Sequence, residues 1–290
     1  MNSTSKGTEF YLKQSLRCGN KMLNIAKPLV MGILNITTDS FYAGSRYAKR
    51  ESWMAAAQQM LKEGAVILDI GATSSRPGAV TVSEDEELRR LIPVVEELAH
   101  AFPDAVLSVD TYRAVVAAKA IERGAHIIND ISAGELDPAM FETIAGLGVP
   151  YIMMHMQGTP NHMQVNPVYT DVVNDIKTYF ERRLEKLHHY GAVDILIDPG
   201  FGFGKTIFHN YEILRRLNEF SSIGLPIVAG LSRKSMIYKV LDSTPEQALT
   251  GTTVLHTLAL LNGANILRAH DVREAVETIK LMEVYKIKPV

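Results

Sequence analysis

A chain of 290 residues, 47% of them hydrophobic and 21% charged, is long enough for one large domain with a fully buried core. A net charge of −2 leaves no basic excess for gripping a phosphate backbone, which argues against nucleic acid and favours a small-molecule substrate. The opening residues lack the blocks of a signal peptide, no apolar run could span a bilayer, and Cys18 is the single cysteine. We therefore expect a cytoplasmic protein with no membrane partner and no intrachain disulfide.

Short apolar runs rich in β-branched residues recur along the chain, and each is followed by a segment with helix-type apolar spacing. The eight predicted strands are 29–36, 66–71, 105–110, 126–131, 150–155, 194–198, 226–231 and 265–270. The predicted helices between them include 51–62, 84–101, 112–123 and 171–189. This alternation predicts parallel strands joined by crossover helices.

Glycines punctuate the pattern just before strands, where a helix needs a left-handed residue to end. They are Gly64, Gly124, Gly148, Gly191, Gly224 and Gly263. The connections that follow strands are longer and more polar, and long loops on one side are the functional face of a (β/α)₈ barrel. An open doubly wound sheet is the main alternative, but eight units without a GxGxxG turn after the first strand favour closure. We predict an α/β fold, a TIM barrel over residues 28–290, with residues 1–27 capping the barrel bottom.

Polar side chains stand at or just after the ends of the predicted strands. They are Asn35, Asp69, Asp110, Asn129, Asp130, His155, Asp198, Lys234, Arg268 and His270. A single aspartate in such a place is often only the N-cap of the next helix. A closed parallel barrel, however, brings all these ends into one mouth, where so many polar groups are costly for folding unless a ligand uses them. The convergence predicts a binding site.

The cations at these ends suggest what is bound. Arg268 and His270 are one residue apart and should share a face of the strand, where an arginine beside a histidine suits a phosphate oxyanion. The alternative for Arg268 is a local ion pair with Asp271 or Glu274.

Lys234, in Ser-Arg-Lys-Ser, has two possible roles. It could form a Schiff base, as in barrel aldolases, or donate hydrogen bonds. The nearby string DPGFGFGK at 198–205 lacks P-loop spacing, and its glycines are expected to allow close approach of a flat ligand, with Phe203 as an aromatic wall. No His/Cys spacing suggests zinc.

Seven motifs, taken together, resemble those of the dihydropteroate synthase family in order and spacing. They are MGILNITTDSF at 31–41, DIGATSSRPG at 69–78, SVDT at 108–111, INDI at 128–131, DPGFGFGKT at 198–206, GLSRKS at 230–235 and LRAHD at 267–271. The resemblance implies a TIM-barrel transferase of folate synthesis, which joins a dihydropterin-methyl diphosphate to 4-aminobenzoate and releases diphosphate. It also implies Mg²⁺ as a cofactor, a homodimer, and the activity that sulfonamides inhibit.

The resemblance assigns roles to individual residues. The pterin set is Asp110, Asn129, Asp198 and Lys234; the diphosphate set is Asn35, Arg268 and His270, with Asn35 also near Mg²⁺; the 4-aminobenzoate set is Ser75, Arg76, Pro77, Phe203 and Ser235. Carbon–oxygen cleavage would leave a cation-like centre for the arylamine to capture. Asp110, Lys234, Arg268 and His270 are the expected catalytic residues. Because no nucleophilic residue is needed, the resemblance disfavours a Schiff base at Lys234.

Both long loops depart from the family pattern. Thr38, Ala43 and Ser45 replace a proline, an aspartate and a glycine of the first loop, and Thr73 replaces the glutamate of the second. Two rival functions follow. One is a methyltetrahydrofolate methyltransferase, which would need no diphosphate site; the other is a barrel that binds pterin without turnover.

Overall fold

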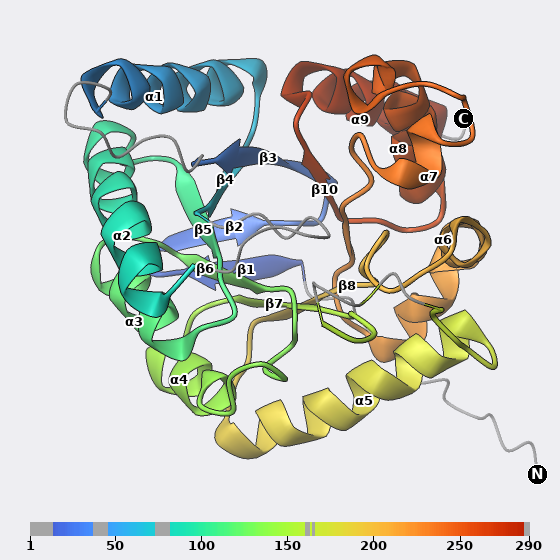
Figure 1. Cartoon of the computed structure of the whole chain (residues 1–290), viewed down its shortest axis with the longest axis horizontal. Helices are drawn as coiled ribbons and strands as arrows, with labels where there is room; N and C mark the ends of the chain where they lie inside the picture. Colours follow the sequence, from blue (N-terminus) through green and yellow to red (C-terminus); the bar gives the residue numbers. More distant parts are fainter. Residues whose placement is uncertain (1–13, 37–45, 73–81, 160–162, 164–165, 287–290) are drawn as a thin grey trace, which may run out of the picture.

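Eight parallel strands form a barrel in the computed structural model, which describes residues 14–36, 46–72, 82–159, 163 and 166–286 (Figure 1). The hydrogen-bonded order is β8-β7-β6-β5-β4-β3-β10-β9, and a parallel bridge between Ile197 and Ile227 joins the two ends of the sheet. The strands are β3 (Leu29–Asn35), β4 (Ile67–Gly71), β5 (Val106–Asp110), β6 (Ile127–Asp130), β7 (Tyr151–Met154), β8 (Ile195–Asp198), β9 (Val228–Ala229) and β10 (Ile266–Ala269). The predicted TIM barrel is confirmed, and the open sheet is wrong.

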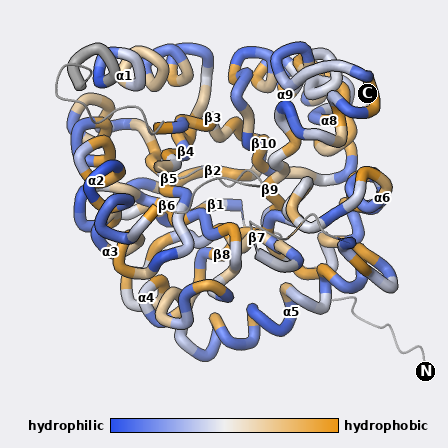
Figure 2. Tube along the Cα trace, viewed as in Figure 1, coloured by the Kyte–Doolittle hydropathy of each residue, from blue (hydrophilic) through white to orange (hydrophobic). Residues whose placement is uncertain are grey.

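Helices surround the barrel, and their order alternates with the strands (Figure 1). They are α1 (Arg46–Glu63), α2 (Glu84–Ala101), α3 (Ala114–Glu122), α4 (Met140–Leu147), α5 (Val172–Tyr190), α6 (Ile207–Arg215), α7 (Ser235–Tyr238), α8 (Leu249–Leu261) and α9 (Val272–Lys286), with 3-10 turns at η2 (Leu217–Ile223) and η3 (Pro245–Gln247). The strands are hydrophobic and the outer helices carry most of the hydrophilic residues (Figure 2). No helix of the described residues is long and apolar enough to cross a membrane.

The helix ends follow the sequence signals closely. Helix α2 begins after Ser83, whose Oγ accepts a hydrogen bond from the Glu86 amide. Gly148 and Gly191 end α4 and α5 in the left-handed region, with φ of 61° and 89°. All six glycines predicted to end helices have positive φ. Returns from helix to strand are therefore tight, and the longer connections gather at the carboxyl ends of the strands.

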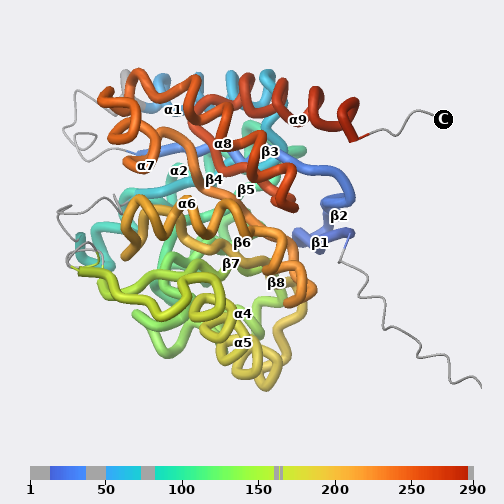
Figure 3. The backbone as a smooth tube through the Cα atoms, turned by 90° about the vertical axis from the view of Figure 1, so that its right-hand side faces the viewer, coloured from blue at the N-terminus to red at the C-terminus, as the bar shows by residue number. Residues whose placement is uncertain are grey.

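An apolar plug closes the other end of the barrel. Strands β1 (Ser15–Cys18) and β2 (Lys21–Asn24) form an antiparallel hairpin at this end (Figure 3). Leu16 and Cys18 are fully buried and share one cluster with residues near the starts of the barrel strands, such as Ile67 and Ile266. Described residues before the barrel thus cover its bottom, while the domain boundary at residue 27 stays a prediction. Polar groups are left to the opposite end.

Candidate active site

The polar residues predicted at strand ends do meet at the carboxyl end of the barrel. Asn35, Asp110 and Asp198 are the last residues of β3, β5 and β8. Asn129 and Arg268 are each one position before the end of their strands, and Lys234 and His270 follow β9 and β10. Because neighbouring strands run parallel with a fixed register, residues far apart in the chain come together here.

Arg268 lies between two carboxylates at the centre of this end. Its Nε donates to Asp69 Oδ2 at 2.6 Å, and its Nη2 donates to Asp110 Oδ2 at 2.9 Å. The local alternative, a pair with Asp271 or Glu274, is wrong, because Arg233 holds Asp271 through two hydrogen bonds. Arg268 instead links β10 to β4 and β5.

Asp69 is the residue to which the sequence assigned no role. It is fully buried and also accepts from Ser108 Oγ at 2.6 Å and from Asn129 Nδ2 at 3.1 Å. With Asn129 and Arg268 both fixed on one carboxylate, Asp69 orients two of the predicted ligand-binding side chains. A signal was available: Asp69 is a charged residue in the middle of an otherwise apolar strand, every residue of which is buried.

Asp198, Lys234 and Arg268 converge over Gly230. A Cβ atom placed on Gly230 would lie 3.6 Å from both Asp198 Oδ2 and Lys234 Nζ, and 4.0 Å from the Arg268 Cδ. Lys234 Nζ donates to the Phe201 carbonyl and stands 4.8 Å from the centre of the Phe203 ring. The absence of a side chain at Gly230 leaves room for a ligand against these groups.

Burial shifts the charges of this site toward neutrality. It raises the pKa of Asp110 to about 7, with Asp69 adding to the rise and the Arg268 guanidinium opposing it. Burial also raises the pKa of Asp198, against the attraction of Lys234, and lowers the pKa of Lys234 to about 8. Two of the predicted catalytic groups therefore titrate near neutral pH, as is common at functional sites.

Ser232 orients His270, a partner that the sequence did not indicate. Ser232 Oγ accepts from the His270 amide at 3.2 Å and lies 3.0 Å from His270 Nδ1. The hydroxyl can donate its proton to Nδ1 or accept a second hydrogen bond from it, so the contact orients the imidazole in either tautomer. With the ring proton on Nε2, His270 can donate to an oxyanion.

Two of the three glycines in residues 198–205 accommodate backbone of this chain, while Gly202 faces Lys234 and the predicted approach of a flat ligand stays a prediction there. Gly200 and Gly204 have φ of 72° and 63°, and a Cβ atom on either would overlap a backbone oxygen, of His155 and Gln157 respectively. The close approach they permit is therefore to the residues after β7, not to a flat ligand. Phe203, by contrast, is half-buried and contacts an apolar cluster beside the site.

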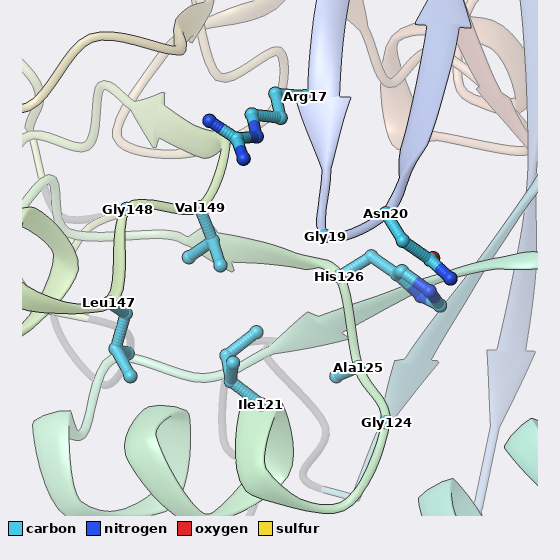
Figure 4. A pocket seen from close by; sticks show the side chains of 10 residues that line it. All are labelled: Arg17, Gly19, Asn20, Ile121, Gly124, Ala125, His126, Leu147, Gly148 and Val149. Carbon is cyan, nitrogen blue, oxygen red and sulfur yellow. The ribbon is translucent and has the colours of Figure 1, made fainter.

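A hollow of about 510 Å³ lies at the opposite end, beside the hairpin turn (Figure 4). It is lined by Arg17, Asn20, His126 and the glycines that follow α3 and α4. His126 Nδ1 accepts from the Leu107 amide, and burial lowers the pKa of His126 to about 4. The imidazole that lines this hollow is thus bound to the backbone of the barrel and stays neutral near pH 7. We therefore place the active site at the other end, at the carboxyl ends of the strands.

Comparisons with known proteins agree with this placement. A family model described as pterin binding enzyme matches residues 31–270. A dihydropteroate synthase of Haemophilus influenzae is 43% identical over 270 residues, covering 92% of this chain and 98% of the relative. The crystal structure of the Yersinia pestis dihydropteroate synthase with a sulfonamide drug complex has a TM-score of 0.88 at 43% identity, covering 94% of this chain and 99% of that chain. This chain belongs to the dihydropteroate synthase family.

A further relative carries a ligand. The Xanthomonas albilineans dihydropteroate synthase in complex with 7,8-dihydropteroate has a TM-score of 0.84 at 36% identity and covers 95% of this chain and 100% of that chain. The family predicted from the motifs is confirmed, and with it a transferase of folate synthesis. The methyltransferase alternative is wrong, because these high-coverage relatives are dihydropteroate synthases.

Several predicted residues of a dihydropteroate synthase site lie outside the described part of the chain. These are Ser75, Arg76 and Pro77, together with the departures at Thr38, Ala43, Ser45 and Thr73. Asn35 is described, is exposed, and has its Oδ1 beside Gly71 and Asp110. Ser235 begins α7 directly after Lys234. Among the residues that the structure describes, no group of three or more His, Cys, Asp or Glu side chains could hold a metal.

Proposed function

We propose that this chain condenses (7,8-dihydropterin-6-yl)methyl diphosphate with 4-aminobenzoate, giving 7,8-dihydropteroate and diphosphate. The observation that carries the proposal is the convergence of two carboxylates, an amide, an ammonium and a guanidinium at one end of the barrel. A pterin edge offers an amino group and ring N–H donors beside carbonyl and ring-nitrogen acceptors. The side chains of Asp110, Asn129, Asp198 and Lys234 form the matching complement.

Arg268, His270 and Asn35 are the proposed diphosphate ligands. Arg268 uses two of its five N–H groups on carboxylates of the described chain, and the other three can reach phosphate oxygens without breaking that contact. His270 offers its Nε2 proton. Both groups therefore bind more strongly as negative charge collects on the departing diphosphate.

Mg²⁺ fits the donor set. This ion takes one or two protein oxygens and completes its shell with substrate phosphates and water, so the absence of a carboxylate cluster among the described residues does not conflict with it. The exposed Asn35 carboxamide is the proposed protein ligand. When bound, Mg²⁺ would neutralise charge on the diphosphate.

The reaction needs no covalent enzyme intermediate. The bond between the pterin methylene carbon and the diphosphate oxygen breaks, and the electron pair leaves with diphosphate. The carboxylate of Asp110 stabilises the positive charge that develops on the pterin. The nitrogen of 4-aminobenzoate then bonds to the methylene carbon and loses a proton. Lys234 donates hydrogen bonds in this scheme, as it does to Phe201 in the structure.

The second substrate is proposed to lie between Phe203 and Ser235 on one side and Ser75, Arg76 and Pro77 on the other. Phe203 stands beside Lys234, and Ser235 directly follows it, so both are adjacent to the proposed pterin site. A planar aromatic acid suits an aromatic wall and a cation.

A turnover assay tests the proposal. Purified protein is mixed with Mg²⁺, the dihydropterin-methyl diphosphate and 4-aminobenzoate, and dihydropteroate and diphosphate are measured. Stoichiometric release of both products is the expected result. Tight pterin binding with no product would support the alternative of a barrel that binds pterin without turnover, for which the four loop departures are the motivation.

We also propose a cytoplasmic homodimer. Helices α8 and α9 pack together and expose apolar side chains at helical spacing: Val254, Leu258 and Leu261 on α8, and Leu281, Val284 and Tyr285 on α9. An apolar face across two adjacent helices suits contact with a second copy of the chain.

A further inference from the structure

A lysine is buried directly below the proposed site without a carboxylate partner among the described residues. Lys205 is 3% exposed, and its Nζ lies 2.9 Å from His155 Nδ1, 3.3 Å from the His155 carbonyl and 2.9 Å from the Phe203 carbonyl. An ammonium has three donors, and here it meets three acceptors. Burying a charge in this way costs free energy. If the side chain only filled space, an apolar residue would do so without that cost.

His155 must accept the proton of this contact. Two cations at 2.9 Å would repel each other, and burial lowers the pKa of both His155 and Lys205 well below their ordinary values. The Asp198 carboxylate opposes this shift for Lys205, so the neutral partner is the His155 ring. His155 is itself fixed: it directly follows β7, its amide donates to the Asp198 carbonyl at 3.0 Å, and the Tyr179 ring packs edge-on against it at 4.7 Å. Lys205 therefore ties the segment after β8 to a rigid support.

The tied segment carries two contacts of the site. The Phe201 carbonyl accepts from Lys234 Nζ, and the Phe203 ring packs beside the same ammonium. The segment lies so close to the residues after β7 that only glycine fits at 200 and 204, and Tyr169 Oη donates to the Gly204 carbonyl at 2.8 Å. Small displacements of this segment would move the Phe203 ring, which belongs to it, whereas Lys234 belongs to the chain that begins α7.

We propose that Lys205 and His155 form a positioning pair that fixes residues 199–205 and so sets the Phe203 wall for the aryl substrate. The expected effect on KM rests on the proposed function, whereas the expected effect on the structure of residues 199–205 does not. Lys205 touches no substrate and is not a catalytic residue. Its loss should weaken the aryl site more than the pterin set, because Asp110 and Asn129 are held by Asp69 and Arg268 on other strands.

The test compares Lys205→Met with Lys186→Met, a matched change at an exposed lysine of α5. We expect Lys205→Met to raise KM for 4-aminobenzoate by about tenfold, the effect of losing roughly one net hydrogen bond, with KM for the pterin substrate changed by less than about twofold. Hydrogen exchange of amides 200–206 should also accelerate, while exchange of the barrel strands stays unchanged. The exchange result is obtained even if the wild-type protein makes no product, so failure of the two proposals can be told apart.

Rescue at His155 separates positioning from general packing. Asparagine places an acceptor near the position of Nδ1, whereas leucine offers none. His155→Asn should retain the wild-type KM for 4-aminobenzoate more closely than His155→Leu. Equal behaviour of these two variants, a uniform rise of exchange throughout the barrel, or an unchanged KM and exchange in Lys205→Met would each overturn the proposal.

Discussion

One guanidinium faces two carboxylates at the centre of the site, and the uncompensated negative charge contributes to the raised pKa of Asp110. Arg268 neutralises one charge of the pair formed by Asp69 and Asp110, and the deeply buried Asp69 has three donors while Asp110 has fewer. Burial raises the pKa of Asp110, and the nearby Asp69 carboxylate adds to that rise while Arg268 opposes it. A group that must be charged to accept pterin N–H bonds thus titrates close to working pH.

We expect a narrow bell in the pH dependence of kcat/KM for the pterin substrate. Asp110 has a pKa raised to about 7, so activity should fall on the acid side as it takes up a proton. Lys234 has a pKa lowered to about 8, so activity should fall on the alkaline side as its ammonium loses a proton. Steady-state rates across the neutral range measure both limbs. A broad plateau extending well to both sides would contradict these protonation states.

Asp198 and Lys234 should each contribute strongly to pterin affinity. Asp198→Asn and Lys234→Ala remove opposite sides of the hydrogen-bond complement in a desolvated site, and each should weaken pterin binding by about 1–3 kcal/mol. Isothermal calorimetry with a non-reactive pterin gives the affinities, and Lys239→Ala, at an exposed lysine after α7, is the control. Wild-type affinity in both variants would remove these residues from the pterin site. Borohydride trapping of an adduct at Lys234 would revive the Schiff-base alternative.

Arg268 and His270 should differ in what they affect. His270 contacts Ser232 and is proposed to bind only the diphosphate, so His270→Ala should weaken a diphosphate-bearing pterin while leaving a bare pterin unaffected. Arg268→Ala should weaken both ligands, because Asp69 and Asp110 then face each other without a cation between them. Affinities of the two ligands for the two variants decide this. Selective loss of the diphosphate ligand in both would mean that Arg268 does not position Asp110.

At the scale of elements, the sequence predicts where strands lie better than it predicts which side chains contact one another. Every barrel strand lies inside its predicted range, and α2 has the predicted bounds, because buried parallel strands and a capped helix depend on local pattern alone. Helix α3 begins at Ala114 instead of residue 112, since Arg113 is extended and pairs with the buried Glu87. That pair joins two different barrel units, which no local pattern reveals.

The site shows the same limit. Strand ends identified which side chains meet, but not which of them bind one another in the free protein. The protein partners that the sequence offered for Arg268 were only the local alternatives Asp271 and Glu274, yet its partners are 199 and 158 positions away. Ser232 and Lys205 lie in two of the quoted motifs but received no role, because only the closed barrel brings them to His270 and His155.

The hairpin before the barrel should stabilise the fold without affecting catalysis. Leu16 is fully buried among the first residues of the barrel strands, so Leu16→Ala should lower the free energy of unfolding by about 2–5 kcal/mol. Met22→Ala on the same hairpin, 67% exposed, is the control and should change it by less than about 0.5 kcal/mol. Urea denaturation gives both values, and KM should stay constant in each variant. Equal stability of the two would mean that the hairpin does not support the barrel.

At the scale of the molecule, the barrel separates stability from chemistry. Apolar side chains fill the end of the barrel where the strands begin, and charged side chains gather where the strands end. The apolar end stabilises the fold, so the charges buried at the other end can serve ligand binding. The helices complete this arrangement around the strands (Figure 1).

The exposed face of α8 and α9 gives the last prediction, which concerns assembly. Leu281 and Val284 are 73% and 69% exposed on α9, which packs against α8, where Val254 and Leu258 are exposed. If a second copy covers this face, Leu281→Glu buries a carboxylate in an apolar contact and should separate the dimer. Neither residue belongs to the strand ends that form the site.

Sedimentation or light scattering of the wild type and of Leu281→Glu measures the effect directly. We expect a dimer for the wild type and a shift to monomer for the variant, with pterin affinity unchanged because the mouth of the barrel is formed by other elements. Val115→Glu introduces the same charge at a single exposed valine of α3, on another side of the barrel, and should leave the dimer intact. A wild-type monomer, or equal dissociation of both variants, would show that this face is not the contact between subunits.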